Sequence, residues 1–104
     1  MRLAPIALAL VLTGCASGSA RLTEGKALAD SWVALGAAAQ VADGLAKSGA
    51  LHGQDAARAS ADLRAANTAL TDATGLYNAG SDPTALIISA TKAITDVYAI
   101  SGAK

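Results

Sequence analysis

The spacing of apolar residues along the chain predicts three helices, over residues 22–48, 54–79 and 83–101. In the middle segment, apolar residues recur every seven positions, with alanines three positions later, which places them on one helix face. The outer segments carry apolar residues at spacings of three and four. The positions that form these faces are Leu28, Trp32, Leu35, Ala39, Ala42 and Ala46; Ala56, Ala59, Leu63, Ala66, Leu70, Ala73 and Tyr77; and Leu86, Ala90, Ala93, Val97 and Ile100, with Ile87 and Ile94 beside the third set.

The residues between these segments are typical of helix ends. Gly49 and Gly80 follow the first two segments, where a glycine can adopt the left-handed conformation that ends a helix. Asp82 and Pro83 open the third segment, as its N-cap and its first helical residue, and Gly102 ends it. Because short loops favour antiparallel neighbours, we predict an all-α fold, a small antiparallel three-helix bundle.

Alanine is the commonest residue and phenylalanine is absent, which favours helices over a sheet and predicts close approach of the helix axes. Gly36, Gly44 and Gly75 lie inside the predicted helices, where each costs about 1 kcal/mol relative to alanine. We expect them either at close helix crossings or at breaks in the helices.

Residues 1–14 have the layout of a signal peptide. Arg2 is followed by an apolar run from Leu3 to Leu12 and then by small residues. A run of about ten residues is roughly 15 Å long as a helix, too short to cross a hydrocarbon core of about 30 Å. The third helix is not expected to cross a membrane either, because Lys92 and Asp96 interrupt it.

The sequence Leu12-Thr13-Gly14-Cys15 resembles the lipobox of bacterial lipoproteins, in which a branched residue and two small residues precede a cysteine. The resemblance implies that the Cys15 thiol carries a diacylglyceryl group, that the chain is cut before Cys15, and that the new amine is often acylated. Two or three acyl chains hold a protein firmly at a membrane. The partner that this implies is the membrane, reached through lipid on Cys15.

The domain organisation that follows is a signal peptide at 1–14, a lipidated cysteine with a flexible tether at 15–21, and a helical domain at 22–104. Ala16, rather than an aspartate, follows the cysteine, which resembles the sorting signal for the outer membrane. In a source with two membranes, we therefore expect the protein on the outer membrane, facing the periplasm. The alternative is an ordinary secretory signal, cut near Gly18-Ser19-Ala20.

Charge and cysteine usage exclude several classes of partner and site. The formal net charge is zero, and the basic residues are scattered singly, so we do not expect nucleic-acid binding. With Arg2 removed, seven basic residues face eight acidic ones. One cysteine leaves no intramolecular disulfide and no cysteine-based metal cluster.

No motif predicts a catalytic, cofactor or metal site. His52, the one histidine, is expected to be an exposed loop residue, and Asp55, Arg58 and Asp62 are expected to form a solvated helix face with weak pairing.

The aromatic residues Trp32, Tyr77 and Tyr98 are the candidates for an interface with a partner. For Trp32, its place in the apolar stripe favours the core over an interface.

These patterns predict a small envelope lipoprotein that acts as a structural or protein-interaction module without catalysis. One alternative is the lipoprotein component of a phage or prophage lysis system, although many of those are proline-rich and this mature region has only Pro83. Another is an ordinary secreted helical protein. An enzyme would need a site made from the scattered carboxylates.

Overall fold

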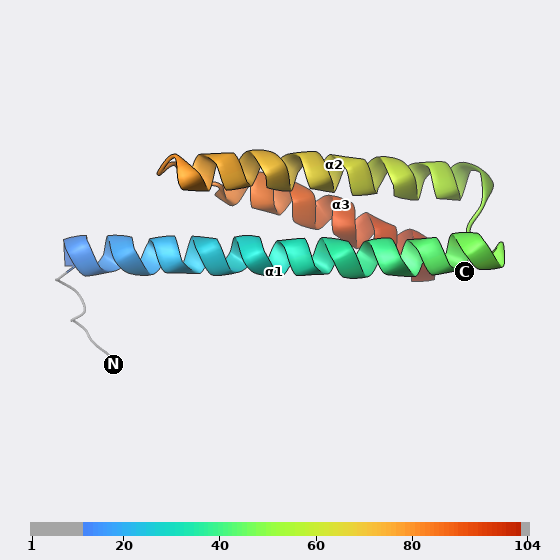
Figure 1. The fold of residues 1–104 in the computed structure, drawn as a ribbon, viewed down its shortest axis with the longest axis horizontal. Helices are drawn as coiled ribbons and strands as arrows, with labels where there is room; N and C mark the ends of the chain where they lie inside the picture. Colours follow the sequence, from blue (N-terminus) through green and yellow to red (C-terminus); the bar gives the residue numbers. More distant parts are fainter. Residues whose placement is uncertain (1–11, 103–104) are drawn as a thin grey trace.

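The computed structural model describes residues 12–102, with side chains described from Arg21 onward. Its described part contains three helices, α1 (Leu12–Ser48), α2 (Gly53–Asn78) and α3 (Thr84–Gly102), and no strand. The helices lie side by side, with α2 antiparallel to α1 and α3, and each helix contacts the other two (Figure 1). The predicted all-α three-helix bundle is confirmed.

The predicted boundaries of α2 and α3 agree with the structure to within one residue, and α1 ends where it was predicted to end. The N-terminal end of α1 differs, because the helix begins at Leu12 and includes residues 15–21, which were predicted as a flexible tether. This stretch contains alanine and serine but no proline, so a helix already formed in the bundle can extend through it without a new nucleation step. Most of the predicted signal peptide falls on residues 1–11, outside the described part of the chain.

Both helix-ending glycines take the predicted left-handed conformation. Gly49 and Gly80 each have a φ of 85°. After α2, the Ser81 amide donates to the Leu76 carbonyl at 2.8 Å and the Gly80 amide donates to the Tyr77 carbonyl at 3.1 Å. This is the paired hydrogen bonding of a Schellman motif, and it turns the chain sharply toward α3.

Asp82 caps α3, as predicted. Its Oδ1 accepts a hydrogen bond from the Thr84 amide at 2.9 Å and another from the Thr84 hydroxyl at 2.5 Å. These hydrogen bonds favour the ionised form and lower the pKa of Asp82. Pro83 is buried beside the cap, so the second connection is fixed at both ends.

The core lies between the three helices and consists of alanine and branched aliphatic residues. Half of its buried apolar residues are alanines, which matches the predicted close packing. Its members are Leu28, Leu35, Ala38 and Ala42 of α1; Leu51; Ala59, Ala66, Ala69, Leu70 and Ala73 of α2; and Ala90, Ile94, Val97 and Ile100 of α3.

The prediction for the three interior glycines is wrong. The helices run through Gly36, Gly44 and Gly75 without a break, and a Cβ built at any of them would meet nothing within 4 Å. The close approach is instead at Gly25, where a Cβ would lie 2.7 Å from the Tyr77 hydroxyl oxygen. Sequence spacing could not identify it, because the contact depends on how α1 and α2 are aligned.

Candidate functional site

Cys15, the predicted lipid attachment residue, lies in the first turns of α1. Its side chain is outside the described residues, so lipidation stays a prediction.

Trp32 lies at the edge of the core rather than inside it. Its side chain is 36% exposed, and its indole N–H donates to the Thr74 hydroxyl of α2 at 3.2 Å. The preference for a core position is therefore wrong, because α1 turns this residue toward the margin of its contact with α2. Tyr98, on α3, is 42% exposed. A role for Trp32 or Tyr98 in an interface stays a prediction.

Tyr77 belongs to a cluster at the end of the bundle where α2 turns into α3. The Arg21 guanidinium lies over the Tyr77 ring, 4.0 Å from its centre, and the Tyr77 hydroxyl donates to the Arg21 carbonyl at 3.1 Å. Arg21 also donates to the carbonyls of Tyr77 and Ser81, and it forms an ion pair with Glu24 at 3.0 Å. We refer to Arg21, Glu24, Tyr77 and Ser81 as the Arg21 cluster.

The Arg21 cluster adds a side-chain donor to two carbonyl groups at this turn, that of Tyr77 in the last turn of α2 and that of Ser81 just after the helix. A cation at a helix C-terminus also interacts favourably with the helix dipole. The tyrosine ring fits against α1 because Gly25 has no side chain. These contacts explain Tyr77 as a structural residue that joins α1 to the end of α2.

A second polar cluster joins α2 to α3. The Arg58 Nε donates to Asp96 Oδ2 at 2.9 Å, and the Arg58 Nη2 contacts the other carboxylate oxygen of Asp96. Asp62 is half-buried, and its Oδ2 is buried without a hydrogen-bond partner. We refer to Asp62 and Asp96 as the carboxyl pair. The expected solvated face is wrong for Asp62, since this residue lies against α3.

The two members of the carboxyl pair have opposite pKa shifts. Burial, followed by the hydrogen bond that a protonated Asp62 makes to Asp96 and by the negative charge of Asp96, raises the pKa of Asp62 to about 6 from an ordinary value of 3.8. The hydrogen bond with Asp62, followed by the contact with Arg58, lowers the pKa of Asp96. The environment thus favours one protonated and one ionised carboxyl group.

His52 is exposed in the connection between α1 and α2, as predicted. It occupies the N-cap position of α2, but its side chain does not cap the helix. The ring Nδ1 lies 3.0 Å from the Gly49 carbonyl oxygen. The imidazole therefore contacts the backbone of its own turn.

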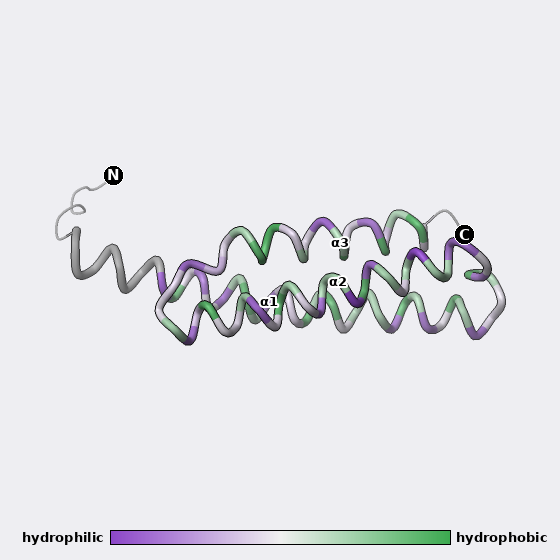
Figure 2. Tube along the Cα trace, turned by 90° about the horizontal axis from the view of Figure 1, so that it is seen from above, coloured by the Kyte–Doolittle hydropathy of each residue, from purple (hydrophilic) through white to green (hydrophobic). Residues whose placement is uncertain are grey.

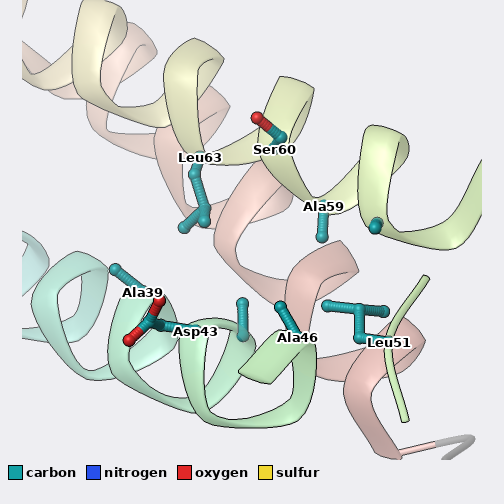
Figure 3. Close-up of a pocket in the computed structure, with 9 residues that line it drawn as sticks. Ala39, Asp43, Ala46, Leu51, Ala59, Ser60 and Leu63 are labelled. Carbon is teal, nitrogen blue, oxygen red and sulfur yellow. The ribbon is translucent and has the colours of Figure 1, made fainter. Parts of the chain in front are cut away.

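An open groove of about 380 Å³ runs between α1 and α2 near this turn (Figure 3). Alanines of both helices line most of it, together with Leu51 and Leu63. The Ser60 hydroxyl points away from the space between the helices. Asp43 is the one charged residue of the lining, and its carboxylate pairs with Lys47 at 2.9 Å. The lining of the groove is therefore mainly apolar.

The outward face of α1 also exposes apolar side chains. Leu22 is 75% exposed and Val33 is 73% exposed. They are eleven residues apart, close to three helical turns, and so lie on the same face of the helix. Figure 2 shows that hydrophilic residues are spread over all three helices instead of gathering in one patch.

None of the described helices is both long and apolar enough to cross a membrane. Among the same residues, no three or more histidine, cysteine, aspartate or glutamate side chains are grouped so that they could hold a metal ion.

Comparison with protein-family models, with curated proteins and with solved structures finds no match to this chain.

Proposed function

We propose that the protein is a small envelope lipoprotein, anchored to a membrane by lipid on Cys15, whose helical bundle acts as a structural or protein-interaction module without catalysis. The observation that carries the proposal is the sequence Leu12-Thr13-Gly14-Cys15 at the end of an apolar run that begins soon after Arg2. In this proposal, the three-helix bundle is the domain that the lipid holds at the membrane.

The lipid anchor rests on the chemistry of the cysteine. A thiol is the nucleophile that can become a thioether, and Cys15 is the one thiol in the chain. Buried methylene groups contribute about 0.8 kcal/mol each, so two or three acyl chains give stable membrane attachment.

The interaction role is supported by how the bundle uses its polar and apolar side chains. Arg21 and Arg58 are engaged in contacts that join helices, and Asp43 pairs with Lys47. Leu22 and Val33 remain exposed on one face of α1, where contact with a partner would bury them.

Intact mass spectrometry of the protein extracted from a membrane fraction tests the anchor. We expect a mass equal to the chain from Cys15 plus a diacylglyceryl group, with or without an amide-linked acyl chain. A Cys15→Ala variant should lose the lipid mass and leave the membrane fraction, whereas a Ser19→Ala variant should keep both. A lipid-free wild-type chain that begins at or after Ala16 would contradict the proposal and support an ordinary secreted protein.

The outer-membrane location is a finer part of the proposal and rests on Ala16, which follows the cysteine. In a source with two membranes, density-gradient separation should place the wild-type protein in the outer-membrane fraction. An Ala16→Asp variant, which resembles the retention signal, should move to the inner-membrane fraction. Recovery of both forms in the same fraction would contradict this part.

A further inference from the structure

The carboxyl pair places two acidic side chains from different helices against each other, with one cation, Arg58, beside them. Both hydrogen bonds from Arg58 go to Asp96, and the side chain of Arg58 is 59% exposed. Asp62 receives neither of these bonds, and its Oδ2 is buried without a partner. The arginine therefore hydrogen-bonds to Asp96 and acts on Asp62 only through its charge.

An ionised Asp62 would leave a buried oxygen unpaired beside a second carboxylate, which is costly in free energy. A protonated Asp62 has an O–H group, which it can donate to the Asp96 carboxylate. One proton thus turns a repulsive contact into a charge-assisted hydrogen bond. The raised pKa of Asp62, about 6, agrees with this geometry.

We propose that Asp62 and Asp96 share one proton across the α2–α3 contact and form a pH-sensitive device, which stabilises the bundle in mildly acidic surroundings and weakens it when the proton is released to water. The inference goes beyond the proposed lipid anchor and does not depend on it.

The charged groups that set the proton affinity of Asp62 come from two helices. Asp96 approaches from α3, and Arg58 lies one turn earlier on α2. Asp55 lies on the same side of α2, seven residues before Asp62, and has a contact of its own. On α1, in this half of the bundle, Asp43 and Lys47 pair with each other.

The pKa shifts determine the direction of the pH dependence. The unfolded chain releases the Asp62 proton near pH 3.8, and the folded chain releases it near pH 6. The contribution of Asp62 to stability is therefore complete below about pH 4 and is lost as the pH rises through about 6. The lowered pKa of Asp96 acts in the opposite direction, with a contribution that is lost as the pH falls below 3.8. Together the two groups favour the folded chain most at about pH 4.

Urea unfolding of the purified protein at pH 5 and pH 7 tests the proposal. The unfolding equilibrium constant of the wild type should rise roughly fivefold to tenfold between these pH values. Asp62→Asn, which resembles the protonated form and cannot ionise, should remove most of this rise and should be more stable than the wild type at pH 7. Asp72→Asn, an exposed change on the same helix, should leave the rise unchanged.

A second variant keeps the test informative if Asp62→Asn does not fold. Asp96→Asn removes the facing carboxylate and frees Arg58 for Asp62, so it should also reduce the rise between pH 5 and pH 7. The proposal would be overturned if wild type, Asp62→Asn and Asp96→Asn showed the same change in unfolding constant. It would equally be overturned if Asp72→Asn abolished the rise as completely as Asp62→Asn does.

Discussion

Two arginines join helices in this bundle, and their partners differ in kind. Arg21 is 35% exposed and donates to the carbonyl groups of Tyr77 and Ser81, with the Tyr77 ring beneath it. Arg58 is 59% exposed and binds a carboxylate, Asp96, which faces a second carboxyl group. The acceptors that Arg21 reaches beyond α1 do not titrate, and its one carboxylate partner, Glu24, lies on its own helix. The acceptor that Arg58 reaches on α3 does titrate.

This difference determines when each contact stabilises the bundle. A carbonyl accepts a hydrogen bond at any pH, so the bonds from Arg21 to the Tyr77 and Ser81 carbonyls hold α1 against the end of α2 over the whole pH range. The carboxyl pair is favourable when it holds one proton and unfavourable when it holds none. One end of the bundle is therefore fixed, while the α2–α3 contact at Asp62 is conditional.

The largest effect should come from removing the ring that supports Arg21. Tyr77→Ala removes a half-buried aromatic side chain packed against the core, the cation–π contact and a hydrogen bond, and should destabilise the protein by about 2–4 kcal/mol. Tyr98→Ala, at a tyrosine that is 42% exposed, should destabilise by less than about 1 kcal/mol. Urea unfolding at pH 7 measures both. Equal losses from the two variants would refute the structural role of Tyr77.

Changing each arginine compares the two regions directly. Arg21→Ala removes a side-chain donor from the Tyr77 and Ser81 carbonyls and a positive charge from the end of α2, and should cost about 1–2 kcal/mol at both pH 5 and pH 7. Arg58→Ala should cost less than about 1 kcal/mol, because its ion pair is exposed to solvent. Loss of Arg58 should also move the pH dependence upward, since this cation lowers the pKa of Asp62. The comparison fails if Arg58→Ala is the more damaging change, or if Arg21→Ala shifts the pH midpoint.

The smallest predicted effect is the difference in stability between alanine substitutions at two glycines of α1. Gly36→Ala adds a methyl group in open space and should stabilise the protein by up to about 1 kcal/mol through helix propensity. Gly25→Ala has the same propensity gain, but its Cβ would lie 2.7 Å from the Tyr77 hydroxyl oxygen, so the ring must shift. We expect a lower melting temperature for Gly25→Ala than for Gly36→Ala. Similar melting temperatures would mean that Tyr77 moves away from Gly25 freely.

The sequence predicted the helices well because their signals are local. The seven-residue repeat from Ala56 to Tyr77 and the caps at Gly49, Gly80 and Asp82 depend on residues close in the chain. The start of α1 was predicted wrongly because the local signal is ambiguous there. Small residues such as those after Cys15 fit a flexible tether as well as a helix.

The polar clusters escaped prediction because each joins residues far apart in the chain. Arg21 and Tyr77 are 56 residues apart, and Arg58 and Asp96 are 38 residues apart. Periodicity shows which face of a helix is apolar, but not which residue on one helix lies opposite a given residue on the next. From the sequence, Asp96 was only a charge that interrupts α3. Trp32 was predicted in the core because periodicity does not show how α1 is aligned against α2.

The most direct test of the conditional contact is an NMR titration of the aspartate carboxyl carbons between pH 3 and pH 8. The account predicts a midpoint near 6 for Asp62 and a midpoint below 3.8 for Asp96, with each signal also responding to the titration of the other. Independent titration of both residues near 3.8 would contradict it, because two uncoupled carboxylates could not share a proton.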